Sequence, residues 1–340
     1  MVIQLSPGQG IMFRAVPEDC LATIKIGPDG QPYYFWSNAL ALPVSTQVEL
    51  AQRGVNFFYP SPPSIDIRGP NWVVNLCNEP DQSRTAMIAL DRAFGEIIPI
   101  FNHPKAIQMS RRDISAKNLA DIPNLYVPKT IRFEPKNPSS FEQAFVEYGF
   151  KYPVLVRPEG SQQGNGLVRI NNPDDWIEVL HSAWRGRPHY MTQFVDFSDE
   201  NGIFKKIRIA VVGNRAFLRA YGVSENWQIG HPQASGALGT LEERCKRLGE
   251  QHDLFPGWTA AQDVARAIAD RVKLDFFGID LGVIDKSTFV LFEANAAMSI
   301  ADKSTLPSEM ESLIGRVYDN IIDALSTHIL SPNDWVYDGC

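Results

Sequence analysis

The segment GIDLGVIDKSTFVLFEAN, residues 278–295, constrains the fold of this chain more than any other stretch. Two strongly apolar runs, over 276–284 and 288–292, flank a polar turn candidate at 285–287. Apolar runs of this length on either side of a short polar turn predict an antiparallel β-hairpin. The polar residues within the two strands can therefore be assigned faces and partners.

Asp280, Glu293 and Asn295 are the residues of this hairpin that indicate chemistry. Symmetrical pairing around the turn places Asp280 opposite Glu293, about 5 Å apart at Cβ. Asn295 lies on the same face as Glu293 and opposite Gly278, which leaves open space beside the amide. Facing carboxylates repel each other unless a charge neutralises them, and Mg²⁺ prefers oxygen ligands with positions left for phosphate. We infer a magnesium site, with a solvent-exposed polar strand face as the alternative.

A glycine-rich hairpin over 152–170 is the second informative segment. Its first strand runs into Arg157, and a loop with Gly160, Gly164 and Gly166 leads into the second strand. Glycines let backbone N–H groups approach phosphate oxygens, and an arginine at the strand end adds a fixed positive charge. The loop lacks GK[ST] and precedes a strand, so it is neither a Walker A loop nor a Rossmann fingerprint. We infer a phosphate-binding flap, with an ordinary mobile hairpin loop as the alternative.

The other elements predict an α/β plus α+β protein. A strand over 72–77, a helix over 84–94 and a strand over 97–101 indicate a parallel α/β layer near the N-terminus. A later hairpin pairs 207–212 with 216–221 around Gly213-Asn214. Further helices are expected over 113–120, 141–148, 173–183, 259–272 and 308–325, the last two with the capping boxes Thr259/Gln262 and Ser308/Glu311.

Length, charge and cysteine usage exclude several classes of protein. The 340 residues suit two or three lobes, and the net charge of −7 without a basic tract argues against a nucleic-acid-binding protein. No apolar stretch reaches the roughly 18 residues of a membrane span, and the first residues do not read as a signal peptide. The four cysteines form no CxxC pair. We expect a cytoplasmic enzyme with no membrane or nucleic-acid partner and no zinc site, and a homodimer is the commonest oligomer to expect.

The order of these features resembles the ATP-grasp superfamily, which includes D-alanine–D-alanine ligase and glutathione synthetase. A strand with Arg157-Pro158, the flap, an apolar hinge, a strand with Arg208 and the GxD…ExN hairpin follow one another as in that family, over roughly residues 100–325. Stretches such as SENWQIGH and LFEANAAM are similar to a less characterised ligase-like branch. The resemblance implies an ATP-grasp fold in three parts, which are an N-terminal α/β domain over 1–104, a small lobe with the flap over 105–190 and a large lobe with the metal site over 191–340.

The resemblance also implies ATP and Mg²⁺ as cofactors and gives roles to individual residues. Asp280, Glu293 and Asn295 match the magnesium ligands, and Arg208 and Arg157 match groups that contact phosphate or the acyl-phosphate intermediate. Arginine replaces lysine at the phosphate positions, and Gly278-Ile279-Asp280 replaces the RxD of D-alanine ligases, which weakens an assignment to D-alanine ligation. The other nucleotide contacts that the family implies are Arg112 (or Arg111), Val156, Gly164, Gln193, Phe194, Val195 and Phe292.

The activity implied is that of an ATP-dependent carboxylate–amine ligase, which activates a carboxylate as an acyl phosphate and joins it to an amino acid or peptide amine. A peptide-modifying ligase that forms side-chain amides or esters and an ATP-dependent phosphotransferase are the alternatives. The three metal ligands argue against a regulatory protein that only binds the nucleotide. Trp227 and His231 fit a substrate-facing loop and a structural loop equally well, and Glu79, which could hold an amine, fits a surface turn better.

Overall fold

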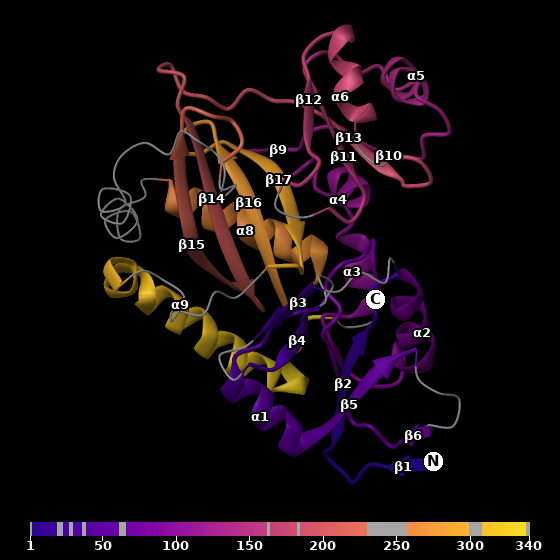
Figure 1. Cartoon of the computed structure of the whole chain (residues 1–340). Coiled ribbons are helices and arrows are strands. Elements are labelled where there is room, and N and C mark those ends of the chain that lie inside the picture. The colour runs from indigo at the N-terminus through magenta and orange to yellow at the C-terminus, as the bar shows by residue number, and fades with distance from the viewer. Residues whose placement is uncertain are drawn as a thin grey trace.

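The computed structural model describes residues 2–18, 23–26, 30–35, 39–60, 66–161, 164–181, 184–229, 257–298 and 308–337. Three sheets, of four, four and five strands, organise these residues, together with two further strand pairs. Figure 1 shows an N-terminal layer at the bottom, a large lobe above it on the left and a small lobe above it on the right. Parallel pairing in the N-terminal layer and mainly antiparallel pairing in the two lobes confirm the expected α/β plus α+β class. No described helix is long and apolar enough to cross a membrane.

The N-terminal layer is a parallel sheet in the order β5-β2-β7-β8. The helix expected over 84–94 is confirmed as α2 (Arg84–Phe94), which buries Ala86, Met87 and Leu90 at helical spacing. The strands expected on either side of it are shorter than predicted, with β7 at Val73–Asn75 and β8 at Ile100–Phe101. The layer also contains β1 (Val2–Gln4), β2 (Gly10–Ala15), β3 (Thr23–Ile26), β4 (Pro32–Phe35), α1 (Val44–Arg53), β5 (Gly54–Tyr59), β6 (Asp66–Arg68) and α3 (Pro104–Met109).

The small lobe is an antiparallel sheet in the order β10-β13-β11-β12. The predicted glycine-rich hairpin is confirmed, because β11 (Val154–Pro158) pairs with β12 (Val168–Ile170). The expected boundary at residue 190 falls inside β13 (His189–Gln193), which lies between β10 and β11. The lobe also contains α4 (Arg112–Asn118), β10 (Thr130–Phe133), α5 (Ser140–Glu147), η1 (Pro173–Asp175) and α6 (Trp176–Leu180).

The large lobe is a five-stranded sheet in the order β15-β14-β16-β17-β9. Side chains alternate along its strands, so Ile207, Ile209 and Val211 of β14 face α8, whereas Ala210 and Val212 pack with α9. We call the face opposite α8 the site face. The lobe contains β9 (Leu125–Tyr126), β14 (Phe204–Val212), β15 (Arg215–Ser224), α8 (Trp258–Val272), β16 (Phe276–Val283), β17 (Phe289–Asn295), α9 (Ser308–Ile329) and η3 (Pro332–Asp334).

The helix predicted over 259–272 is confirmed as α8, but its predicted capping box is wrong. Val264, Ile268 and Val272 are buried, as their spacing predicted. The helix begins one residue earlier, at Trp258, so Gly257 occupies the N-cap and no side chain caps the first turn. The second predicted box, Ser308 with Glu311, lies outside the side chains that the structure describes.

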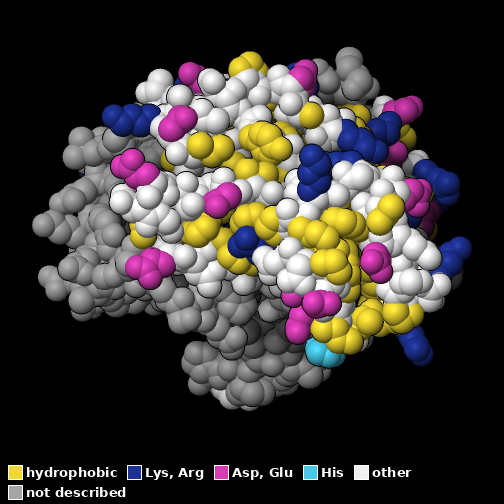
Figure 2. Space-filling view, turned by 90° about the horizontal axis from the view of Figure 1, so that it is seen from above, with side chains coloured by type: hydrophobic (Ala, Val, Ile, Leu, Met, Phe, Trp, Pro, Cys, Tyr) yellow, Lys and Arg dark blue, Asp and Glu magenta, His cyan; other side chains and the backbone are white. Residues whose placement is uncertain are grey.

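Asn102 fixes the N-terminal layer to the large lobe. Its backbone N–H donates to Oδ2 of Asp275 at 2.7 Å, and its side chain exchanges two hydrogen bonds of 2.9 Å with the backbone of Phe276. His328 of α9 contacts Oδ1 of the same aspartate at 3.0 Å. Asp275 lies just before β16 and Phe276 begins that strand, so the layer and the strand that carries Asp280 are held in one arrangement. Figure 2 views the molecule from above, on the side away from the N-terminal layer, where hydrophobic side chains form a band interrupted by charged ones.

Candidate functional site

The central pairing predicted for the hairpin is confirmed. Asp280 lies opposite Glu293, and Gly278 lies opposite Asn295. The assumption of symmetrical pairing around the turn is wrong, because the register shifts after Asp280 and Leu281 lies opposite Leu291. A β-bulge at Phe292 absorbs the extra residue.

This bulge decides which side chains reach the site face. Leu291 and Ala294 belong to the core beneath α8, so the two residues between them both point away from that helix. The Phe292 ring packs on Phe197, with centroids 5.0 Å apart, and lies against Gly282. A regular strand would place Phe292 and Glu293 on opposite faces. The bulge therefore brings an aromatic ring and a carboxylate to the same face.

The space expected beside Asn295 is filled. A Cβ atom at Gly278 would lie 2.5 Å from Cε of Met298, so glycine makes room for this methionine and leaves no opening. The Asn295 side chain accepts a hydrogen bond of 3.0 Å from the backbone N–H of Ala297 at Oδ1. This bond orients the amide oxygen in a fixed direction.

Basic side chains neutralise Asp280. The Arg208 guanidinium donates two hydrogen bonds of 2.6 Å to its two carboxylate oxygens, and Lys206 Nζ lies 2.7 Å from Oδ2. Burial raises the pKa of the Asp280 carboxyl, but Lys206 and Arg208 outweigh burial and hold that pKa well below its usual range. The carboxylate is therefore ionised at neutral pH. Lys206 was not predicted, although its place two residues before Arg208 puts it on the same strand face.

Glu293 has its own cationic partner, Arg112, at the start of α4. The Arg112 guanidinium donates to Oε2 of Glu293 and reaches the carbonyl of Phe292 at 3.5 Å. Burial raises the pKa of Glu293, and the charge of Arg112 reverses this effect, so the net pKa is lowered. Arg111, the other arginine considered for this position, pairs with Asp113 at 2.7 Å. The structure thus brings Arg112, and not Arg111, to the hairpin.

Arg157 reaches the same charges from the small lobe. Burial and the nearby Arg112 lower its pKa to about 10, while Glu293 and Glu79 act in the opposite direction. Its guanidinium donates to the hydroxyl of Ser161 at 3.1 Å and to the backbone carbonyl of the same residue. Arg112, Arg157, Lys206 and Arg208 therefore surround the two carboxylates from three different elements.

Val156 occupies the core face of β11. It is buried in the core of the small lobe with Phe141 and Met191. Along β11, Val154 and Val156 are buried, whereas Leu155 and Arg157 are partly exposed on the other face. Side chains alternate along a strand, so the neighbour that shares the face of Arg157 is Leu155. The prediction that Val156 contacts the base is not favoured by this placement.

The expected adenine hinge, Gln193 to Val195, lies at the end of β13. The backbone N–H of Gln193 donates to Lys129 at 2.9 Å, and that of Phe194 donates to Pro153 at 3.3 Å. The Val195 N–H donates to no residue in the described part of the chain. Of the three hinge residues, Val195 therefore retains a backbone donor for a ligand.

The side chain of Phe194 lies between two other side chains. The Arg169 guanidinium lies over its ring at 3.9 Å, and the Trp227 ring meets it edge-on at 5.8 Å. Trp227 thus contacts the hinge, while His231 lies outside the described residues. This contact gives Trp227 a structural position beside the expected base site.

The glycine-rich loop contacts the N-terminal layer. The Gly160 N–H donates to Oδ2 of Asp81 at 3.4 Å, and Tyr190 of β13 donates to both oxygens of that carboxylate at 2.8 and 2.9 Å. Gly164 has a positive φ of 75°, a conformation that favours glycine, and its carbonyl accepts from Leu167 at 3.1 Å. Residues 162 and 163, between these glycines, lie outside the described part of the chain.

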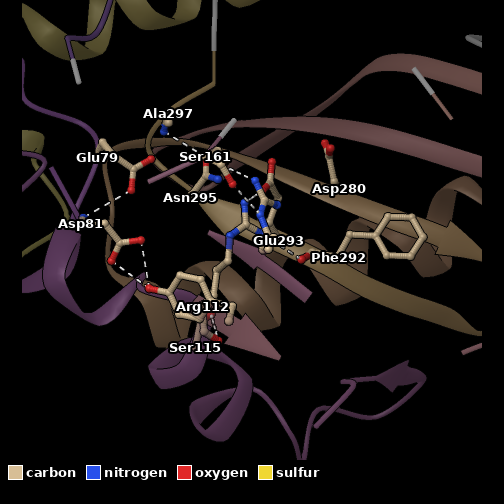
Figure 3. A network of polar contacts seen from close by, with 12 residues as sticks. Glu79, Asp81, Arg112, Ser115, Ser161, Asp280, Phe292, Glu293, Asn295 and Ala297 are labelled. Carbon is tan, nitrogen blue, oxygen red and sulfur yellow. Dashed lines mark hydrogen bonds and ion pairs between the residues drawn. The ribbon is translucent and has the colours of Figure 1, made fainter. Parts of the chain in front are cut away.

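Glu79 is buried and not part of a surface turn, so the simpler prediction for it is wrong. Its exposed fraction is 5%, and Figure 3 shows it approaching Asn295 from the N-terminal layer, with Asp81 beside it. Burial, followed by the charge of Asp81, raises the pKa of Glu79 to about 7. Arg112 and Glu293 also influence this pKa, which places Glu79 within the same electrostatic cluster.

The donors on the site face fit a magnesium ion. Within the described residues, no three His, Cys, Asp or Glu side chains form a metal-binding group. Asp280 and Glu293 are ionised and face each other, and Asn295 presents an oriented oxygen beside them. Carboxylate and amide oxygens are the ligands that Mg²⁺ prefers. The surrounding guanidinium and ammonium groups suit the phosphates that accompany this ion in nucleotide sites.

Comparison with known families and curated proteins identifies distant ligase relatives. No protein-family model matches the chain. Tetrahydromethanopterin:alpha-L-glutamate ligase of Methanococcus maripaludis is 24% identical over 229 residues, which are 66% of this chain and 68% of the relative. N-acetylaspartylglutamate synthase A of Homo sapiens is 26% identical over 145 residues, 43% of this chain and 33% of the relative. The chain thus spans about a third of the length of this second relative.

Solved structures share the fold across nearly the whole chain. A D-alanine–D-alanine ligase from Bacillus anthracis aligns with a TM-score of 0.51 and 13% identity, covering 96% of this chain and 99% of that one. The VanG D-Ala:D-Ser ligase from Enterococcus faecalis gives 0.52 and 12%, covering 93% and 98%. A RimK domain ATP-grasp protein from Sphaerobacter thermophilus gives 0.50 and 17%, covering 86% and 98%. These similarities establish the fold.

Proposed function

Because the chain has the ATP-grasp fold, we propose that it is an ATP-dependent ligase that activates a carboxylate and joins it to an amine. Asp280, Glu293 and Asn295 lie on one face of the large-lobe sheet, and four basic side chains from three elements converge on them. This convergence is the observation that carries the proposal. Such a site suits a triphosphate with its metal, since ionised oxygen ligands lie among groups that bind phosphate.

Asp280, Glu293 and Asn295 would hold the magnesium ion, which when bound neutralises charge on the transferred phosphoryl group. Arg157 and Arg112 hold the phosphates of ATP from the small lobe and from α4. Phe292 and the ring of Phe194 lie beside the base, and the Val195 N–H donates to it. The glycine-rich loop around Gly160 and Gly164 covers the phosphates and keeps water from the acyl phosphate.

Arg208 stabilises the negative charge on the phosphoryl group as it passes from ATP to the carboxylate. Its planar guanidinium is bonded to Asp280, so it is held at the edge of the metal ligands and not in bulk solvent. The carboxylate oxygen attacks the γ-phosphorus, ADP leaves, and an amine then displaces phosphate from the acyl carbon. Positioning and fixed charges supply the catalysis in each of these steps.

The chemistry of the relatives suggests where to begin the search for substrates. The names of both relatives contain glutamate, so L-glutamate is the first amine substrate to test. Amino acids and short peptides are the class that we propose.

Release of ADP and phosphate from ATP with pooled amino acids tests this function. Release that needs two different substrates, together with an amide product, supports the ligase. A stable phosphorylated product would instead make the protein a phosphotransferase. Absence of release with every pool would contradict an enzymatic role and leave a nucleotide-binding protein.

A further inference from the structure

Arg219 owes its position to a second β-bulge on the other side of the large-lobe sheet. Arg208 of β14 lies opposite Ala220, but the next residue, Ile209, lies opposite Leu218. Arg219 is therefore the extra residue of the bulge. Leu218 belongs to the core beneath α8, so the alternation of side chains turns Arg219 toward the site face.

The guanidinium of Arg219 pairs with no carboxylate among the described residues. Its Nε atom is buried, and the side chain forms no hydrogen bond or ion pair with any residue in the described part of the chain. It lies over the ring of Tyr318 on α9, with 5.6 Å from Cζ to the ring centroid. Burial is the main reason that the pKa of Arg219 is lowered. A partly buried cation without a hydrogen-bonded anion is unfavourable, and an anionic ligand would lower that free-energy cost.

The neighbouring arginine differs in this respect. Arg208 is bonded through two nitrogens to Asp280, so its charge is already neutralised. Arg208 and Asp280 both influence the pKa of Arg219, so the three groups lie in one electrostatic neighbourhood. Arg219 is thus the arginine of this neighbourhood that, among the described residues, is bonded to no carboxylate.

The strand order separates Arg219 from the nucleotide. Asp280 lies on β16, Arg208 on β14 and Arg219 on β15, which is the edge strand. In Figure 1 the small lobe lies on the side of β9 and β17, and β15 is the strand farthest from it. Neighbouring strands are about 4.8 Å apart, so β15 lies roughly 10 Å across the sheet from β16. In the proposed function, the nucleotide lies between the small lobe and β17, and its phosphates reach Asp280. A group bound at Arg219 would therefore belong to the substrate, which lies beyond the phosphates.

We propose that Arg219, with the ring of Tyr318 behind it, binds a carboxylate of the substrate other than the carboxyl group that is phosphorylated. The inference rests on the proposed ligase function and narrows its substrates to molecules with a free carboxylate, such as amino acids and dicarboxylates. The planar fork of arginine matches a carboxylate with two parallel hydrogen bonds. Neutral amines and amides have no carboxylate and could not form these two hydrogen bonds.

The test compares Arg219→Met with Arg215→Met, a control on the same strand whose exposed guanidinium lies over the ring of Phe217. The first measurement is the melting temperature of each protein with MgADP, in sodium succinate and in sodium chloride at equal ionic strength. Succinate is the probe because it carries two carboxylates and no amine. The wild type and Arg215→Met should melt at a higher temperature in succinate than in chloride. Arg219→Met should show a smaller increase, which is the nonspecific stabilisation by the salt alone.

The chloride samples distinguish a ligand site from a structural role. Removing an uncompensated buried charge should leave the melting temperature unchanged or raise it by about 2–4 °C. A clear fall for Arg219→Met in chloride, or equal succinate stabilisation of Arg219→Met and the wild type, would overturn the proposal.

Turnover gives the second measurement. With a productive substrate pair, Arg219→Met should raise the KM of the carboxylate-bearing substrate at least tenfold and leave the KM of ATP unchanged. An increase in the KM of ATP, or no change in either constant, would overturn the subsite while the ligase function stands. If no pair is turned over but the succinate effect depends on Arg219, the subsite is supported and the ligase function fails.

Discussion

Arg208 and Asp280 form a bidentate ion pair, with both hydrogen bonds at 2.6 Å, on the face of the sheet that also carries Glu293. The same two oxygens of Asp280 are the ones proposed to bind magnesium. On this assignment a guanidinium and a metal ion would share one carboxylate. Binding of the metal with ATP would then weaken the ion pair between Arg208 and Asp280, and Arg208 would be able to interact with the phosphoryl group and the substrate carboxylate.

Replacement of Arg208 tests this sharing. Arg208→Met should reduce kcat by about a hundredfold or more, the range seen when one group that stabilises transition-state charge is removed. Binding of Mn²⁺, followed by electron paramagnetic resonance, should be as tight as in the wild type or tighter, because a competitor for Asp280 is gone. A variant that retains kcat within about threefold would contradict the role of Arg208 in charge stabilisation.

The metal ligands can be tested one at a time. Asp280→Asn and Glu293→Gln should each abolish turnover, because each removes a negative charge from the proposed ligand set. Asp285→Asn, an exposed carboxylate in the turn of the same hairpin, is the matched control and should retain activity. Circular dichroism checks that all three variants stay folded, and full activity in the first two would rule out the magnesium assignment.

Arg157 should matter for nucleotide affinity more than for stability. Arg157→Ala removes a partly buried charge proposed to hold phosphate. A charge-assisted hydrogen bond is worth about 1.5–3 kcal/mol, so affinity for MgADP should fall about tenfold or more. Isothermal titration calorimetry measures this change. Arg185→Ala replaces an exposed arginine of the same lobe and should bind as the wild type does. Equal affinities in the two variants would place the phosphates elsewhere.

Glu79 should make stability depend on pH. Its pKa rises from 4.5 to about 7 on folding, so the folded protein retains a proton that the unfolded chain has lost between these values. The resulting stabilisation is complete below pH ~4.5 and disappears as the pH rises through ~7. Glu79→Gln removes this dependence.

The expected consequence is a change in relative stability. From pH 5 to pH 8, the free energy of unfolding of Glu79→Gln should rise relative to that of the wild type by on the order of 2–3 kcal/mol. Urea unfolding at the two pH values measures it, with the exposed Glu200→Gln as the control. A difference that stays constant with pH would show that Glu79 keeps its ordinary pKa.

Much of the site could be predicted because it depends on local patterns. The apolar runs on either side of the turn predicted the hairpin, and Asp280 does lie opposite Glu293. That pairing needed a bulge at Phe292 that nothing in the apolar pattern indicates, because a bulge changes the register without changing the composition. The same reason hides Arg219, since its direction depends on a second bulge.

The remaining errors concern contacts between elements distant in the sequence. Glu79 follows a short strand and precedes a turn-like Pro80, which indicates a surface position. It is nevertheless buried, and Arg112 and Glu293, both distant in the sequence, influence its pKa. Val156 and Leu155 differ in which face of β11 they occupy, and only the position of α5 and α6 decides which face is the core. Gly278 is explained by Met298, a residue beyond the predicted hairpin. Tertiary packing, and not local propensity, sets each of these positions.

The most direct test of the proposed chemistry follows oxygen atoms. Carboxylate activation by ATP transfers one oxygen of the substrate carboxylate to the phosphate that is finally released. The measurement is mass spectrometry of inorganic phosphate after turnover with amino acids labelled with ¹⁸O in their carboxylates. A ligase that forms an acyl phosphate yields phosphate with one ¹⁸O atom per amide bond formed, and release of unlabelled phosphate alongside the amide product would contradict the account.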